Sequence, residues 1–158
     1  RIRFAERMLQ KLESPRTDLY FFDCTDISEK CFKQKAWTTR TNLASFTPKF
    51  YFQTTHLLML ISTQRVVSFQ VMKGNLNTEI VCGFLQNSIH RLCLLRPNNN
   101  IHICLDKATM HRTLLMRNFF QGERVVAVFI PPRNAYFNII EYLFRYIKKD
   151  LRKQLTVK

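Results

Sequence analysis

The order of apolar segments in the sequence predicts an α/β domain whose mixed β-sheet is covered by helices. Strand-like runs come first and form a hairpin, and the rest of the chain alternates strand-like with helix-like segments. The 158 residues are enough for one domain with one hydrophobic core. Because 46% of them are hydrophobic and only three are Gly and five Pro, a disordered or collagen-like chain is excluded.

The first half of the chain is expected to supply one strand and a hairpin. The aromatic run Asp18–Asp23 predicts a strand that ends in a carboxylate. A polar stretch, Thr38–Lys49, predicts a loop. Three further apolar runs predict strands, with a turn at residues 62–64 between the last two: Lys49–Gln53, His56–Ser62 and Arg65–Val71.

In the second half, helices are expected to alternate with strands. Apolar residues at helical spacing predict a helix from Asn77 or Thr78 to Leu95. The loop Arg96–Asn100 separates this helix from the next strand. The remaining predicted elements are a strand at Ile101–Asp106, a helix at Thr109–Phe120 ended by Gly122, a strand at Arg124–Ile130 ended by Pro131-Pro132, and a helix at Asn138–Leu155.

Charge and cysteine content restrict the partners and the compartment. The net charge of +14 makes a polyanion the first partner to consider. The five cysteines include no Cys-x-x-Cys pair and the four histidines are unpaired, so we expect a reducing, intracellular protein without structural zinc. No apolar run reaches the roughly 18–20 residues that cross a bilayer, so no membrane partner is expected. The chain opens with Arg1, which suggests a fragment or a processed product.

Two predicted strands end in an aspartate, Asp23 and Asp106, and a third carboxylate, Glu141, falls in the first turn of the last helix. Functional groups gather beyond the carboxyl ends of strands in such sheets, so these three can converge. Converging carboxylates raise one another's pKa unless a cation lies between them, and magnesium prefers oxygen ligands. Simpler interpretations exist, because an Asp after a strand is often a turn former and Glu141 can pair with Arg145.

Ordered motifs along almost the whole chain resemble the catalytic domain of mariner-superfamily transposases, which are DDE endonucleases. RIRFAERM resembles the lead-in before the first strand of the family. FFDCTDI resembles the motif of the first Asp, and a lone Trp37 follows it. Gly74–Leu85 resembles the segment before the second Asp. LDKATMH resembles the family's Asp-Asn-Ala-x-x-His motif. PPRNAYFNIIE resembles the family's Pro-Pro-Tyr-Ser-Pro-Asp-Leu-Asn-Pro-Ile-Glu block. Thirty-four residues, 107 to 140, separate the last two carboxylates, which is the spacing of one large branch of the superfamily.

The resemblance implies a ribonuclease-H-like mixed sheet of about five strands, with a lead-in at residues 1–17 and a single catalytic domain at 18–158. It implies two Mg²⁺ ions, with Mn²⁺ as a substitute, held by the three carboxylates. The implied reaction is DNA strand cleavage and strand transfer, with transposon ends and target DNA as partners, a homodimer as one arrangement and the nucleus as the compartment. Asn138 would cap the last helix and orient the site, and His111 would lie near it, although each also has a plain capping or packing interpretation.

Several departures from the family pattern fall close to the chemistry. Cys24 follows the first Asp where the family has Glu, and Lys107 replaces the Asn after the second Asp. A lysine that pointed inward would compete with a metal ion. No stretch before Asp18 is long enough for the family's helix-turn-helix modules, so these are expected to be missing. A decayed, domesticated domain that acts as a basic binding or scaffold module is therefore the alternative function.

Cations of the last helix and its surroundings are predicted to contact nucleic-acid phosphates rather than simply to form a solvated helix face.

Trp37 either reaches a partner subunit or DNA, or anchors the sheet as a buried residue. A ribonuclease-H-type RNA hydrolase would use similar carboxylates but would not explain the spacing of the last two. The predicted nucleic-acid-binding residues are Arg112, Arg145, Lys148, Lys149, Arg152 and Lys153.

Overall fold

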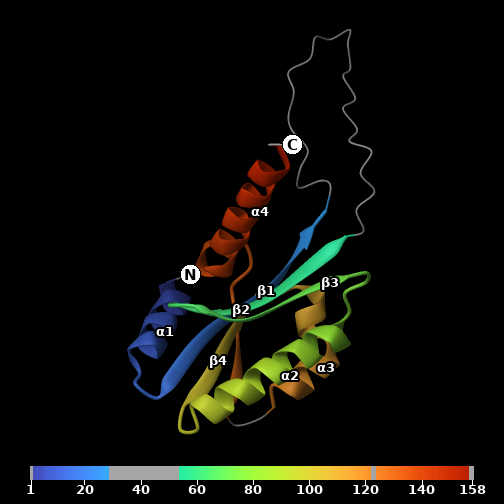
Figure 1. Ribbon diagram of the computed structural model, residues 1–158. Coiled ribbons are helices and arrows are strands. Elements are labelled where there is room, and N and C mark those ends of the chain that lie inside the picture. Colours follow the sequence, from blue (N-terminus) through green and yellow to red (C-terminus); the bar gives the residue numbers. More distant parts are fainter. Residues whose placement is uncertain (1, 29–53, 122–123, 157–158) are drawn as a thin grey trace.

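The computed structural model describes residues 2–28, 54–121 and 124–156 and contains one five-stranded mixed sheet (Figure 1). The strand order is β3-β2-β1-β4-β5, which confirms the predicted α/β class and the mixed sheet of about five strands. The central strand β1 pairs antiparallel with β2 and parallel with β4. The strands are β1 (Thr17–Ile27), β2 (Thr55–Ser62), β3 (Val66–Lys73), β4 (Asn100–Leu105) and β5 (Val125–Phe129).

Helices cover both faces of the sheet and produce two apolar clusters. On one face, α2 (Thr78–Leu95) and α3 (Leu114–Phe119) pack against fully buried strand residues such as Phe22 and Leu60. On the other face, α1 (Ile2–Glu13) and α4 (Ile140–Thr156) pack against strand residues such as Phe21. The two faces follow from the period of two along β1, because neighbouring residues point to opposite sides. In Figure 1, α4 extends away from the sheet.

Local signals fix the predicted hairpin and the start of the long helix. Ser62 and Arg65 form a backbone hydrogen bond of 2.9 Å between β2 and β3, where the turn was expected. The side chain of Asn77 accepts a hydrogen bond from the backbone N–H of Ile80 at 2.9 Å and so caps α2. The predicted strand at Lys49–Gln53, Trp37 and the helix-ending Gly122 lie outside the described residues.

Asp23 does not end the first strand, as the sequence predicted. β1 continues to Ile27 because it keeps pairing with β2 through the Ile27–Thr55 pair, after its pairing with β4 has stopped at Phe21–Cys104. The length of this strand is therefore set by its antiparallel neighbour rather than by its own apolar run. Asp23 lies within a strand that has one free edge at this level.

Three further expectations are corrected. The helix predicted at Thr109–Phe120 is divided into a 3-10 helix at Thr109–Arg112 and α3, because Thr113 is extended and its side chain caps the backbone N–H of Met116. The last helix begins at Ile140 rather than at Asn138. Part of the lead-in forms α1, whose Met8 is buried against the sheet.

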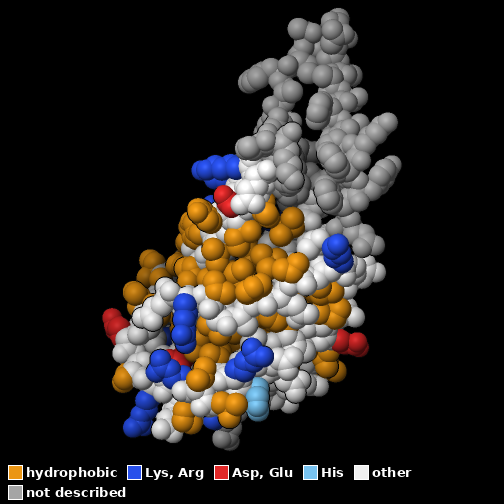
Figure 2. Space-filling model, viewed as in Figure 1, with side chains coloured by type: hydrophobic (Ala, Val, Ile, Leu, Met, Phe, Trp, Pro, Cys, Tyr) orange, Lys and Arg blue, Asp and Glu red, His pale blue; other side chains and the backbone are white. Residues whose placement is uncertain are grey.

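The surface in the view of Figure 2 has hydrophobic side chains in its middle, bordered by Lys and Arg side chains, with few acidic ones. The edge strand β3 contributes exposed apolar residues, with Phe69 65% and Val71 57% exposed. Among the described residues, no helix is both long enough and apolar enough to span a bilayer.

Candidate active site

Asp23 and Asp106 lie at the same level of two neighbouring parallel strands. The last β1–β4 pair is Phe21–Cys104, and each aspartate follows its member of that pair by two residues. Phe21 and Cys104 both point into the cluster under α1 and α4, so the period of two directs Asp23 to this face. Parallel neighbours are about 4.8 Å apart, which places the two aspartates side by side at the edge of the β1–β4 ladder.

Asp23 is buried, with 7% of its surface exposed, and both of its carboxylate oxygens accept hydrogen bonds. The backbone N–H of Cys24 donates to Oδ1 at 2.8 Å. The side-chain amide of Asn138 donates to Oδ2 at 3.1 Å. Asn138 therefore connects β1 to the segment before α4. Its side chain does not cap that helix, which corrects the predicted capping role, and its Oδ1 is buried without a partner among the described residues.

Asp106 follows β4 directly and is held through one oxygen. Its Oδ1 accepts hydrogen bonds from the backbone N–H of Ala108 at 3.0 Å and from Nδ1 of His111 at 2.6 Å. His111 is 1% exposed and packs edge-on against the ring of Phe22, with ring centroids 5.6 Å apart. The hydrogen bond from His111 holds the pKa of Asp106 below its ordinary value of 3.8, although partial burial opposes this.

Glu141 is the second residue of α4, and its backbone N–H donates to the carbonyl of Asn138 at 3.1 Å. Its side chain lines a cavity of about 200 Å³ together with Asp106 and Asn138. The surface ion pair with Arg145 that the sequence allowed does not form, because the guanidinium group of Arg145 lies over the ring of Tyr142, 5.2 Å from its centroid. The structure thus places Glu141 in the same cavity as Asp106.

The pKa of Asp23 reflects both its burial and the charges of its acidic neighbours. Burial, followed by the negative charges of Asp106 and Glu141, raises the pKa of Asp23 from 3.8 to about 7, although the N–H of Cys24 and the ring of His111 oppose the rise. A carboxylate with this pKa is partly protonated at neutral pH. A cation between the carboxylates would remove the penalty on its ionised form.

The donor chemistry of this site fits a hard divalent cation. Three carboxylates and the unpartnered amide oxygen of Asn138 are all oxygen donors. Within residues 2–28, 54–121 and 124–156, no three His, Cys, Asp or Glu side chains gather closely enough to hold one ion together. Magnesium usually binds one or two protein carboxylates and completes its shell with water and phosphate oxygens, so pairs of carboxylates suffice for it.

The predicted basic residues divide into one fixed lysine and several exposed side chains. Nζ of Lys148 on α4 donates to Oγ1 of Thr25 on β1 at 2.6 Å. Lys107 is exposed and lines the same cavity as Asp106 and Glu141. The exposed side chains are Arg112, on the 3-10 helix, and Arg145, Lys149, Arg152 and Lys153, on α4.

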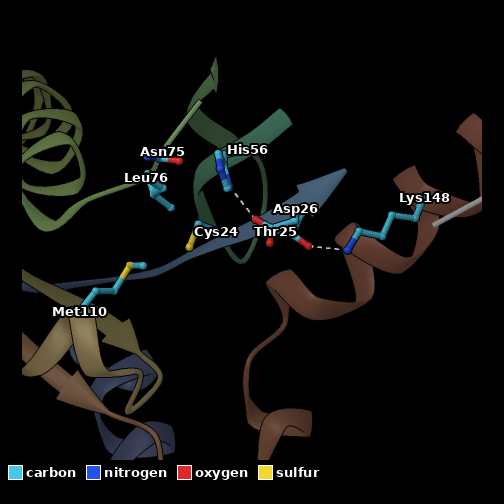
Figure 3. A pocket seen from close by; sticks show the side chains of 8 residues that line it. All are labelled: Cys24, Thr25, Asp26, His56, Asn75, Leu76, Met110 and Lys148. Atoms are coloured by element: carbon cyan, nitrogen blue, oxygen red, sulfur yellow. Dashed lines mark hydrogen bonds and ion pairs between the residues drawn. The ribbon is translucent and has the colours of Figure 1, made fainter. Parts of the chain in front are cut away.

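A larger cavity of about 640 Å³ lies along the C-terminal end of β1, directly after Asp23, and the sequence did not predict it (Figure 3). Nδ1 of His56 lies 2.6 Å from Oδ1 of Asp26, and its Nε2 lies 2.8 Å from the carbonyl of Gly74. Cys24 also lines it, and burial raises the pKa of this thiol to about 12, so the thiol stays protonated. The signal was weak because the His56–Asp26 pair joins residues 30 positions apart.

Comparison with known proteins gives one family and one fold. A family profile described as DDE superfamily endonuclease matches residues 18–158. No curated protein sequence matches the chain. Because the structural relatives are less than 25% identical, their likeness shows the fold, which is that of the ribonuclease-H-like catalytic domain of Mos1 transposase.

Three solved structures illustrate the likeness. The Mos1 transposase paired-end complex with left transposon end is 18% identical with a TM-score of 0.69, over 94% of this chain and 47% of that one. The catalytic domain of Mos1 mariner transposase is 16% identical with a TM-score of 0.68, over 94% of this chain and 68% of that one. A simian T-cell lymphotropic virus intasome is 12% identical with a TM-score of 0.57, over 91% and 42%. The chain spans about half the length of the transposase in the paired-end complex.

Proposed function

The chain belongs to the DDE superfamily endonucleases, and we propose that it is a metal-dependent catalytic domain that cleaves a DNA strand and transfers the freed end to a second DNA. The geometry around Asp106 carries the proposal: Asp23 and Asp106 each follow the last β1–β4 pair by two residues, and Glu141 of α4 lines the same cavity as Asp106. The pKa of Asp23, raised to about 7 by burial and then by the charges of Asp106 and Glu141, agrees with this arrangement. The Mos1 catalytic domain has been solved with Mn and with Mg, which supports these ions as the cofactors.

Each residue of the site has a role that follows from its contacts. Asn138 holds Oδ2 of Asp23 and so fixes the direction of this carboxylate. His111 and the N–H of Ala108 occupy Oδ1 of Asp106, so that Oδ2 is the oxygen left to a ligand. Glu141 completes the set from the start of α4. Two bound magnesium ions would supply an activated water or 3′-hydroxyl and stabilise the leaving oxygen of the phosphodiester.

The proposal extends to the DNA partner and to the cellular compartment of the protein. The exposed cations of α4 and Arg112 would follow the phosphate backbone of transposon ends or target DNA, and Lys148 would stay tied to Thr25. Mos1 transposase is known in a paired-end complex with a transposon end, which supports DNA as the partner. A DNA substrate of this kind would place the protein in the nucleus.

A plasmid-nicking assay tests the proposal. Supercoiled DNA is incubated with the protein in magnesium or manganese, beside Asp106→Asn and Glu141→Gln. We expect metal-dependent nicking in the parent protein and a loss of roughly 100-fold or more in both variants, because each removes a charge that the reaction needs. Glu79→Gln, which changes an acid of the first turn of α2 outside both cavities, is the matched control and should nick as the parent does.

A non-catalytic scaffold is the second candidate, and one observation favours it. Lys107 places a cation in the cavity of Asp106 and Glu141, where a metal ion would otherwise be the counter-charge. In that case the protein would bind DNA without cutting it. Equal background nicking in the parent, Asp106→Asn and Glu141→Gln, together with salt-dependent DNA binding, would establish the scaffold and reject the enzyme.

A further inference from the structure

Two cations, Lys107 and Arg133, line the cavity that contains Asp106 and Glu141. We propose that these side chains bind the phosphate backbone of the DNA strand that enters the carboxylate site; this inference rests on the proposed function. Both residues depart from the family motifs, in which Asn follows the second Asp and Tyr follows Pro-Pro. Positive charge thus reaches one small cavity from two separate segments of the chain.

The charges of both residues are available to a ligand. Each residue is exposed, and neither forms an ion pair with a residue of the described parts of the chain. Both side chains line the same cavity of about 200 Å³ as the carboxylates of Asp106 and Glu141. Carboxylates alone would repel an approaching phosphodiester, and cations on the same wall offset this repulsion. A phosphate is therefore the ligand that suits their charge.

The backbone at Arg133 has a conformation that a residue with a side chain adopts at a cost. Arg133 has a φ of 61°, and it is the one non-glycine residue with positive φ in the described segments. Next to it, the buried Asn134 donates its side-chain amide to the carbonyl of Pro132 at 3.0 Å and accepts from the hydroxyl of Tyr136 at 2.7 Å. Glycine or asparagine would suit a left-handed position better. A strained residue held by its surroundings is typical of a functional site.

Lys107 is positioned by its neighbours on both sides. Asp106 and Ala108 are joined by the hydrogen bond from the backbone N–H of Ala108 to Oδ1 of Asp106, and the buried His111 fixes the same oxygen. The backbone that carries Lys107 is thus part of a tight turn, while its side chain stays exposed. The two cations approach the cavity from the turn after β4 and from the Pro131-Pro132 segment after β5.

The test compares the salt dependence of DNA binding in four variants. Arg133→Gly, Arg133→Asn and Lys107→Asn are measured on duplex DNA in magnesium between 50 and 200 mM salt. Arg91→Ala, which removes an exposed cation of α2 outside both cavities, is the matched control. All four, and the parent whose slope they are compared with, carry Asp106→Asn so that the DNA is not consumed. Nicking is measured with the protein that retains Asp106. Thermal unfolding is recorded for each, because relief of the left-handed backbone should leave the Tm of Arg133→Gly unchanged or higher.

We expect each cavity variant to lower the slope of log affinity against log salt by about 1, as for the loss of one phosphate contact. The fall in affinity from 50 to 200 mM salt then becomes about 4-fold smaller than in the parent, and Arg91→Ala keeps the parent slope. Unchanged slopes in all three cavity variants would overturn the inference. The inference would also be overturned if Arg133→Asn lowered the Tm but kept the parent slope of log affinity against log salt, since that result assigns Arg133 a structural role. Nicking by the parent protein is scored separately, so loss of the proposed function and loss of this inference are distinguishable.

Discussion

Replacing Asp23 with Asn should stabilise the protein, and increasingly so as the pH rises. In the folded protein the pKa of Asp23 is about 7, whereas an unfolded Asp titrates near its ordinary value of 3.8. Between these two values the folded state holds one proton more than the unfolded state, so stability falls as the pH rises. Below pH 3.8 this penalty is absent, and above pH 7 it is complete.

The magnitude follows from the two pKa values. A pKa difference of about 3 units corresponds to about 4 kcal/mol at pH values above 7, at 1.36 kcal/mol per unit. Between pH 5 and pH 8 the stability gap between Asp23→Asn and the parent should widen by about 3 kcal/mol, which is two pH units of slope before the curve levels. At about 2–4 °C of Tm per kcal/mol, the variant should gain roughly 6–12 °C relative to the parent over this range.

Thermal unfolding followed by circular dichroism, in metal-free buffer at half-unit pH steps, measures this gap. Asp106 does not interfere, because its lowered pKa gives stability that is lost only as the pH falls through the acidic range below 3.8. Burial lowers the pKa of His102 below its ordinary value of 6.5, and the stability that this costs on acidification is lost in parent and variant alike, so it cancels in the difference. A gap that stays constant from pH 5 to pH 8 would refute the raised pKa of Asp23, which burial and the neighbouring carboxylates produce.

Two further substitutions test the contacts that hold the aspartates. His111→Ala removes the 2.6 Å contact with Asp106 and a fully buried ring, so we expect nicking to fall roughly 10- to 100-fold, as for other groups that orient metal ligands; nicking at the parent rate would contradict the role given to His111. Asn138→Ala removes the 3.1 Å hydrogen bond to Asp23 and should raise the pKa of Asp23 further, because that donor favours the ionised form. In the same thermal series, the pH at which the stability of Asn138→Ala stops falling should then lie above 7. A levelling pH below that of the parent would contradict this.

Elements with a strong period could be predicted from the sequence. The helix from Asn77 or Thr78 to Leu95, the turn after Ser62 and the strand before Asp106 all lie where expected, because apolar spacing and capping residues are local signals. The helix α1 lies in the lead-in segment, to which the motif resemblance assigns no structure, although Phe4, Met8 and Lys11 share one helical face.

The position of Asp23 could not be predicted, because the end of a strand depends on its partner. β1 extends past Asp23 only where β2 continues to pair with it. The contact of Asn138 with Asp23 joins residues 115 positions apart, and it replaces the local capping role that the sequence favoured. Helical spacing likewise predicted one helix at Thr109–Phe120. The structure instead has a 3-10 helix at Thr109–Arg112, and His111 on this helix contacts Asp106.

The central claim is that Asp23, Asp106 and Glu141 bind divalent ions together. Anomalous scattering from a crystal grown in millimolar manganese tests it most directly. We predict manganese peaks shared between Asp23 and its two acidic neighbours, and their loss in Asp106→Asn. A cluster without manganese, or with Nζ of Lys107 placed between the carboxylates, would contradict the claim.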